Sequence, residues 1–592
     1  MDPSGDGSST INISNRDVKE GVQSTSLGET LGETLGETLG ETLGETLGET
    51  KSTATTVHVT NQADQPVSTT SHRFPRSAHY KQRYAMNIGD KEESAMCVQY
   101  SYEGNKYDLY MPKLIPCAYE NAFLSGRSEK SSADLDKWKE ADLSEIKSIV
   151  LDHNVWDVRQ PPENANIITS KWVRTVKNNG TYKSRLVGRG FNMIHGVDYN
   201  ETFAPVAKMV TLRIFLSLVA IYSLHTGSLD IKTAFLNAPM TEDVWMEPPS
   251  NLISLLNKLL LDNTLTDKQH KTILRHIKQL KLGDKLKLLK ALYGTKQAGR
   301  EWYIMFDKFL KDLGFVPNKA DLCFYTLIIN NTDYVLLLLY VDDVIIAATS
   351  ELLTMRYVGI IGKRFRISFS GELNNYLNIG IIHNRETKTI YMSQEKYIEE
   401  LISTFGIPID TSISTPMQEN LKLLASEEEN TTPRQMQYVS KFPYRKLIGA
   451  IIYLNVCTRP AISYAISILS QFNASPTFLA CKALVRLAKF LYNTKSDKLA
   501  LGGGANTPQI TSFCDSDWGG CINTRYSRSG HIVYIGNGPV VWYSRRQTNV
   551  AQSSAEAEFI AKAPCCQNLN YVRRVINCAS LPNIKLKYTS SL

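Results

Sequence analysis

The sequence predicts an α+β protein built from several domains, and three observations lead to this class. The chain has 592 residues, too many for one ordinary hydrophobic core, so two to four domains are expected. Segments with apolar residues at helical spacing alternate with segments that carry strand and hairpin signals. The apolar run 336–348, LLLLYVDDVIIAA, is typical of buried strands, and Asp342 and Asp343 interrupt it.

The first 130 residues differ in composition from the rest of the chain. The unit LGET occurs six times in succession from Leu27 to Thr50. A Gly in every unit costs a helix about 1 kcal/mol relative to Ala, and a four-residue period is too short for a solenoid. We therefore expect residues 1–130 to form a disordered, low-complexity leader.

The remainder of the chain is basic. The formal net charge is +8, although the six glutamates of the repeat all lie in the leader. A basic body favours a polyanionic partner such as nucleic acid. The ten cysteines form no CxxC pair and none lies near His at zinc-finger spacing, which indicates a reduced intracellular protein. We expect neither a transmembrane span nor a signal peptide.

The folded part is expected to begin near Leu135 with a helix that gives way to a strand at Val155 and Trp156. Residues 171–191 then place two strand-like arms around Asn-Asn-Gly, a strong hairpin signal. This basic hairpin is either a solvated ribbon or a clamp for phosphate groups. Its basic residues are Lys171, Arg174, Lys177, Lys183, Arg185 and Arg189.

An apolar helix is expected from Val210 to Tyr222, followed by a strand that ends at Asp230. An Asp in that position is most often a turn residue. Residues 250–284 are expected to form a Lys- and Leu-rich helical insertion that packs on the surface without chemistry of its own. Residues 292–315 predict a glycine-containing turn that leads into an amphipathic helix.

The Asp342-Asp343 pair has two interpretations. An ionised carboxylate in an apolar setting is costly unless cations or hydrogen-bond donors face it. The pair is therefore either the polar tip of a hairpin or a metal-binding turn that buried strands hold rigid.

Six sequence blocks, in order, resemble the reverse transcriptase of copia-type LTR retrotransposon polyproteins over roughly residues 140–480. The blocks are SRLVGRGF, DYNETFAPVAK, LDIKTAFLN, LYGTKQAGREWY, LLLYVDDVIIA and LNIGI. The resemblance implies a right-hand polymerase, with fingers and palm in residues 131–370 and thumb and connection in 371–505. Where the family usually has the motif GLKQ, this chain has GTKQ, at residues 294–297.

The resemblance also implies site residues. Asp230, Asp342 and Asp343 would bind two Mg²⁺ ions, with Mn²⁺ as a substitute, because hard cations prefer oxygen ligands. Phe235 would be a steric gate against the 2′-hydroxyl of a ribonucleotide, and its alternative role is a core aromatic. The residues expected to contact nucleotide, template or primer are Lys183, Arg185, Phe235, Gln297 and Tyr340.

Residues 514–563 resemble the ribonuclease H domain of the same family, which implies a domain over residues 506–592. Asp515 fits its first carboxylate, with Asp517 as the alternative, and Glu558 fits the second, with Glu556 as the alternative. Ser590 stands about where the family has a further Asp. Because a hydroxyl lacks a carboxylate's charge, we expect a truncated domain with defective RNase H activity.

The function implied is that of a retrotransposon RNA-directed DNA polymerase. Its partners would be an RNA template, an RNA–DNA hybrid, dNTPs and other retrotransposon proteins, without a membrane. The expected location is the cytoplasm, in virus-like particles, with the nucleus as a second site. No protease Asp-[ST]-Gly signature or His/Cys zinc pattern accompanies the polymerase blocks. The alternative is a catalytically inactive transposon relic that binds nucleic acid through a basic groove.

Overall fold

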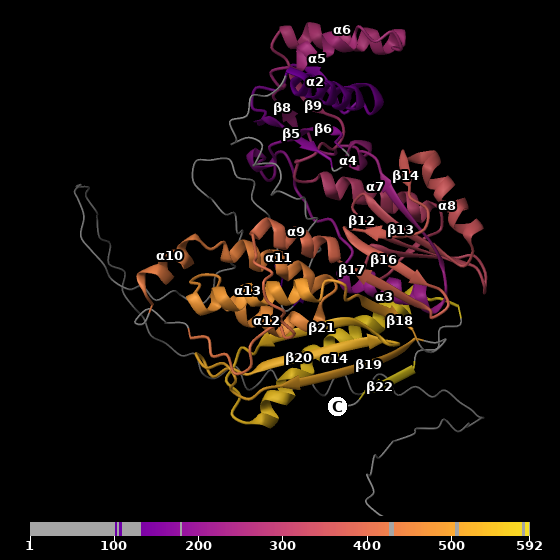
Figure 1. The fold of residues 1–592 in the computed structure, drawn as a ribbon. Coiled ribbons are helices and arrows are strands. Elements are labelled where there is room, and N and C mark those ends of the chain that lie inside the picture. The colour runs from indigo at the N-terminus through magenta and orange to yellow at the C-terminus, as the bar shows by residue number, and fades with distance from the viewer. Residues whose placement is uncertain are drawn as a thin grey trace, which may run out of the picture. The chain divides into compact units, whose positions relative to one another are not determined.

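The computed structural model describes residues 101–103, 106–108, 132–177, 180–424, 431–503, 508–582 and 587–590. The repeat segment of the predicted leader lies outside these residues. Within the leader, the short strands β1 (Ser101–Glu103) and β2 (Lys106–Asp108) pair antiparallel. The mixture of helices and largely antiparallel sheets confirms the α+β class (Figure 1). None of the helices in the described segments combines the length and apolar character needed to span a membrane.

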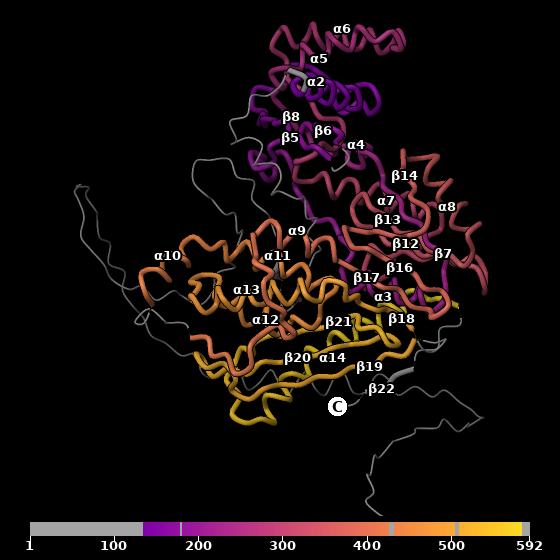
Figure 2. The backbone as a smooth tube through the Cα atoms, in the orientation of Figure 1, coloured from indigo at the N-terminus to yellow at the C-terminus, as the bar shows by residue number. Residues whose placement is uncertain are grey.

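A six-stranded antiparallel sheet contains the predicted aspartates. Its strand order is β10-β11-β12-β13-β7-β14, and β12 and β13 run side by side in the trace of Figure 2. The strands are β7 (His225–Ile231), β10 (Val316–Pro317), β11 (Phe324–Ile328), β12 (Tyr334–Tyr340), β13 (Asp343–Ala348) and β14 (Ile367–Phe369). Every residue of β12 is buried, which agrees with a strand covered on both faces.

Several helices share the core of this sheet, among them α3 (Met209–Ile221), α4 (Ala234–Asn237), α7 (Ala298–Asp312) and α8 (Glu351–Arg364). Nearly every residue of α3 is buried, as the apolar run from Val210 to Tyr222 predicts. The amphipathic α7 confirms the helix expected within residues 292–315, and it buries Trp302, Phe306 and Leu310.

A second core lies around the basic hairpin. The hairpin pairs β5 (Ser170–Val176) with β6 (Tyr182–Gly188), as predicted. A separate four-stranded sheet has the order β3-β9-β8-β4. The other elements are α2 (Ser132–Lys147), the short π-helix Ser148–Asp152, β3 (Trp156–Arg159), β4 (Ile167–Ile168), β8 (Trp245–Met246), α5 (Leu252–Leu259), α6 (Asp267–Lys281) and β9 (Lys285–Leu288).

Residues 375–502 combine a small antiparallel sheet with a helical core. The sheet contains β15 (Asn375–Tyr376), β16 (Ile379–Asn384), β17 (Thr389–Ser393) and β18 (Leu499–Gly502). The helices are α9 (Glu395–Phe405), α10 (Pro433–Lys441), α11 (Tyr444–Cys457), α12 (Ser463–Leu469) and α13 (Phe478–Asn493). Apolar residues of α9, α11, α12 and α13 bury one another in a cluster of their own.

The last sheet has the order β21-β20-β19-β22, and α14 packs beside β19 and β20 (Figure 1). Its elements are β19 (Gln509–Ser516), β20 (Arg528–Ile535), β21 (Gly538–Arg546), α14 (Ser554–Ala579) and β22 (Lys587–Ser590). Strand β22 runs parallel to β19, and a parallel neighbour requires a crossover connection, which α14 supplies.

A buried arginine joins α3 to α11 and β21. The Arg213 guanidinium donates to the carbonyl oxygens of Val540 (2.7 Å), Val456 (2.6 Å) and Cys457 (3.2 Å). Its central carbon lies 3.9 Å from the centre of the Trp542 ring. Burial lowers the pKa of Arg213 to about 9. This side chain therefore satisfies carbonyls at the end of α11 that the helix itself leaves unpaired.

Candidate active site

The three predicted aspartates lie at one end of the β7–β13 strand pair. Asp343 at the start of β13 pairs directly with Asp230 near the end of β7. The backbone N–H of Ile231 donates to the carbonyl of Asp342 at 2.9 Å. Residues far apart in sequence thus become neighbours because two buried strands pair in one register.

The turn that carries Asp342 is strained. Tyr340 pairs with Asp343, so Val341 and Asp342 are the two turn residues. Val341 has φ 57°, and the first central residue of a turn with this pattern is normally Gly. A β-branched residue there costs about 1–3 kcal/mol. The Trp302 indole N–H donates to the Val341 carbonyl at 2.5 Å, so a buried side chain of α7 helps to hold the turn.

The carboxylates do not form a preassembled ligand set. Among the described residues, no group of three His, Cys, Asp or Glu side chains converges as a metal site. The Asp230 carboxylate is 45% exposed and forms an ion pair with Lys232. The oxygen atoms of the Asp230 carboxylate are the type of donor that a hard divalent ion such as Mg²⁺ prefers.

A row of side chains runs from the hairpin towards the aspartates. The Arg185 guanidinium carbon lies 5.4 Å from the centre of the Tyr293 ring, and the Phe235 and Tyr293 ring centres are 5.4 Å apart. Burial raises the pKa of Tyr293, and the carboxylates of Asp342 and Asp230 also raise it. Sequence reasoning missed Tyr293, although it stands in the LYGTKQ block.

A close backbone approach fixes the position of Tyr293. The Gly188 N–H at the end of β6 donates to the Tyr293 carbonyl at 2.8 Å. Gly294 has φ 86°, and a Cβ there would collide with the Gly188 carbonyl oxygen. Only glycine meets both constraints, so the loop seats Tyr293 against the base of the hairpin.

The hairpin cations have acidic neighbours from α2. The Arg174 guanidinium binds the Asp142 carboxylate at 2.6 Å. Burial lowers the pKa of Lys183, and Arg185 and Lys177 lower it further. Burial also raises the pKa of Glu145, whose carboxylate accepts from the Leu186 N–H at 3.3 Å. Sequence reasoning missed Glu145 because nothing local marks its contact with Leu186, 41 residues further along the chain.

Gln297 and Tyr340 lie inside the protein. Gln297 has no exposed surface, and its side-chain amide donates to the Asp198 carbonyl at 2.9 Å. Its Oε1 has no hydrogen-bond partner within the described part of the chain. Tyr340 is 1% exposed, and burial raises the pKa of its hydroxyl. Their nucleotide and primer contacts stay predictions, as does the gate role of the half-buried Phe235.

The candidate RNase H carboxylates lie on the C-terminal sheet and its helix. Glu558 on α14 accepts from the backbone N–H of Ser516 at 3.2 Å, and Ser516 follows Asp515 on β19. Asp517 instead accepts from the Arg528 N–H at 2.6 Å, and Glu556 accepts from the Gln552 N–H at 2.7 Å at the start of α14.

The two alternative acids, Asp517 and Glu556, thus accept hydrogen bonds from nearby backbone N–H groups. In the parallel pairing of β22 with β19, Ser590 is opposite Ser512, three residues before Asp515.

The reverse transcriptase (RNA-dependent DNA polymerase) family matches residues 153–260 and 277–419. The Pol polyprotein of transposon TNT 1-94 from Nicotiana tabacum is 32% identical over 420 residues, which cover 70% of this chain and 30% of the relative. That of transposon RE1 from Arabidopsis thaliana is 32% identical over 461 residues, covering 77% and 28%. The chain therefore spans about 30% of the length of these relatives.

A solved foamy viral protease-reverse transcriptase in complex with double-stranded DNA has a TM-score of 0.40 and 10% identity, covering 77% of this chain and 63% of that one. The family match covers the segments that carry the aspartate turn and the basic hairpin. Residues 153–260 and 277–419 therefore belong to a reverse transcriptase domain, and the relatives of the chain are Pol polyproteins of copia-type retrotransposons.

Proposed function

We propose that the chain catalyses RNA-directed DNA synthesis, adding deoxynucleotides to the 3′-hydroxyl of a primer. The observation that carries the proposal is the direct pairing of Asp343 with Asp230, with Asp342 in the adjoining strained turn. In this assignment the six-stranded sheet is the palm and the basic hairpin belongs to the fingers. Residues 371–505 are the thumb and connection.

Asp230 and Asp342, assisted by Asp343, would hold two Mg²⁺ ions. When bound, these ions would lower the pKa of the primer hydroxyl and stabilise charge on the reacting phosphate. Lys232 balances the charge of Asp230 in the protein itself. The strained turn holds Asp342 at a fixed position, which limits the reorganisation needed during reaction.

Lys183 and Arg185 would bind the triphosphate of the incoming nucleotide. Arg185 can donate two parallel N–H hydrogen bonds to phosphate oxygens, whereas Lys183 acts as a point charge. Tyr293 lies between Arg185 and Phe235. This row leads from the phosphate side of the nucleotide to its sugar, where the Phe235 ring would exclude a 2′-hydroxyl.

We further propose that residues 506–592 form an RNase H-like domain with defective activity. Asp515 and Glu558 would supply two of its carboxylates, and the N–H of Ser516, the residue after Asp515, donates to Glu558. The third position that the family resemblance implies is occupied by Ser590, and a hydroxyl does not replace a carboxylate on Mg²⁺.

Primer extension by the full chain tests the polymerase. The substrates are an RNA template with a DNA primer, dNTPs and Mg²⁺, and the variants are Asp342→Asn and the control Asp312→Asn on the exposed end of α7. We expect Asp342→Asn to lower incorporation by about 10³-fold or more, in line with the loss of a metal ligand, and the control to retain activity. A folded wild-type chain that binds the hybrid and adds no nucleotide would contradict the proposal.

A further inference from the structure

Helix α6 carries a stripe of positive charge along one face. Its cations recur at helical spacing, so they lie on one side of the helix. We call this stripe the α6 basic face, and it consists of Lys268, Lys271, Arg275 and Lys278, all exposed. The buried side of the same helix contains Ile273, Ile277 and Leu280, so packing against the core fixes the direction in which the cations point.

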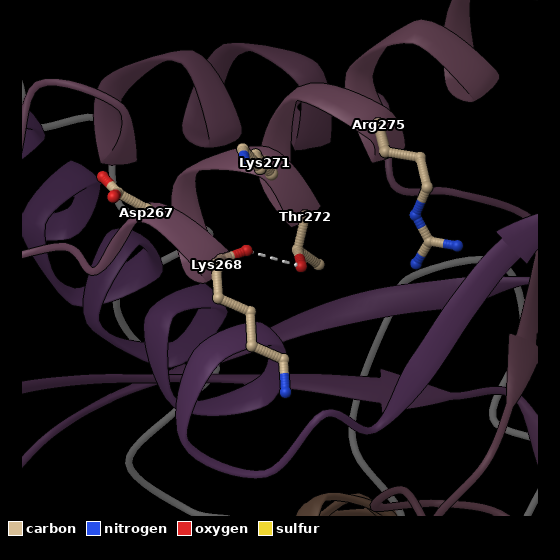
Figure 3. Close-up of a pocket in the computed structure, with 5 residues that line it drawn as sticks. All are labelled: Asp267, Lys268, Lys271, Thr272 and Arg275. Carbon is tan, nitrogen blue, oxygen red and sulfur yellow. Dashed lines mark hydrogen bonds between the residues drawn. The ribbon is translucent and has the colours of Figure 1, made fainter.

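A hollow of about 520 Å³ lies along this face (Figure 3). It is lined by Asp267, Lys268, Lys271, Thr272 and Arg275. Figure 3 shows Lys268 and Arg275 extending from the helix on either side of Thr272. The Thr272 hydroxyl donates to the Lys268 carbonyl at 2.9 Å, and the capping box of Thr266 and Gln269 secures the first turn.

Much of this charge is uncompensated. Arg275 binds the Asp157 carboxylate at 3.0 Å. Across the described ranges, by contrast, no ion pair involves Lys268, Lys271 or Lys278. Asp267 is the single acidic residue of the helix and lies in its first turn, where it complements the helix dipole. The face therefore offers three lysines to an external anion.

The family match skips residues 261–276, which contain Lys268, Lys271 and Arg275. The basic face is thus built largely by a segment beyond the matched reverse transcriptase pattern. The helices predicted for residues 250–284 are confirmed as α5 and α6, and α5 buries Leu252, Leu255, Leu256 and Leu259. The prediction that residues 250–284 have no chemistry of their own does not explain why four cations of α6 are exposed on one face.

We propose that the α6 basic face binds the phosphate backbone of an RNA–DNA hybrid duplex. From Lys268 to Lys278 the helix rises about 15 Å, which matches roughly four phosphates along one strand of a duplex. Helix α6 contains no Phe, Tyr or Trp, so it lacks the stacking surface that single-strand binders use. The proposal rests on the proposed function, because the hybrid is the product of reverse transcription.

The test compares two triple variants of the full chain. One carries Lys268→Gln, Lys271→Gln and Lys278→Gln. The matched control carries Lys308→Gln, Lys319→Gln and Lys363→Gln, which remove the same charge from exposed lysines on other elements. Gln has nearly the same helix propensity as Lys, and circular dichroism verifies that both variants are folded.

Binding of a short blunt RNA–DNA hybrid is measured by fluorescence anisotropy over a range of salt concentrations. Loss of three phosphate contacts lowers the magnitude of the slope of log K against log[salt] by about 2.7, and weakens binding roughly 10- to 100-fold at low salt. The control triple variant is expected to change both quantities much less. Equal changes in the two variants would overturn the proposal, as would a loss confined to single-stranded RNA.

The Asp342→Asn background separates this proposal from the polymerase assignment. In that background no nucleotide is expected to be added, yet the basic face is intact and should still bind the hybrid. If wild-type primer extension fails while the lysine variant weakens hybrid binding, the polymerase proposal falls and the binding surface stands. If extension succeeds and the lysine variant matches its control, the binding surface falls alone.

Discussion

Replacing Arg213 by Met should destabilise the protein strongly without touching the aspartate turn. The substitution removes three hydrogen bonds, at 2.7, 2.6 and 3.2 Å, to the carbonyls of Val540, Val456 and Cys457. It also removes the charge that lies over the Trp542 ring.

Hydrogen bonds to a charged donor contribute about 1.5–3 kcal/mol each. Removal of the desolvation cost of the buried guanidinium offsets part of that sum. A net loss of about 3–5 kcal/mol remains, because the carbonyls stay buried and unpaired.

Thermal unfolding of the full chain, followed by circular dichroism, measures this loss. A cooperative unit of 150–250 residues loses about 2–4 °C per kcal/mol, so the midpoint should fall by roughly 6–20 °C. Arg445→Met is the matched control, because Arg445 is exposed and also donates to backbone carbonyls. A midpoint for Arg213→Met equal to that of the control would refute the structural role assigned to Arg213.

Three further predictions concern pH, the glycine turn and sugar selection. Burial lowers the pKa of His531 to about 4, so the unfolded chain takes up a proton before the folded one does. The contribution of His531 to the free energy of unfolding should be fully present above pH 6.5 and should fall by roughly 3 kcal/mol as the pH drops towards 4. In thermal unfolding, His531→Phe should flatten this pH dependence, and a pH profile equal to that of the wild type would contradict the prediction. Gly294→Ala should lower stability by about 2 kcal/mol or more and reduce primer extension. Gly283→Ala has a similar φ in open space and should cost only about 1 kcal/mol; equal losses would contradict the collision at Gly294. Phe235→Val should lower the preference for dNTPs over rNTPs by about tenfold or more, whereas equal losses with both substrates would favour the core-aromatic role.

The local elements could be predicted where periodicity and turn chemistry agree. The apolar helix expected from Val210 to Tyr222 is α3, and the two strand arms predicted around Asn-Asn-Gly are β5 and β6. The position of Asp230 near a strand end followed from the hydrophobic pattern. These features depend on neighbours in sequence, which is why sequence alone can indicate them.

Long-range partners could not be predicted from sequence. Glu145 meets the hairpin through the packing of α2, and Arg213 finds its acceptors more than 240 residues away. The burial of Gln297 depends on the Asp198 carbonyl, and no local pattern marks that contact.

Mn²⁺ binding to the full chain, measured by electron paramagnetic resonance, tests whether the aspartates are metal ligands. The titration is made with an RNA–DNA primer-template and a dNTP present, for the wild type, Asp230→Asn and the control Asp312→Asn. We expect two bound ions in the wild type and the control, and the loss or at least tenfold weakening of one in Asp230→Asn. Equal Mn²⁺ binding in all three proteins would contradict the assignment of the aspartates as metal ligands.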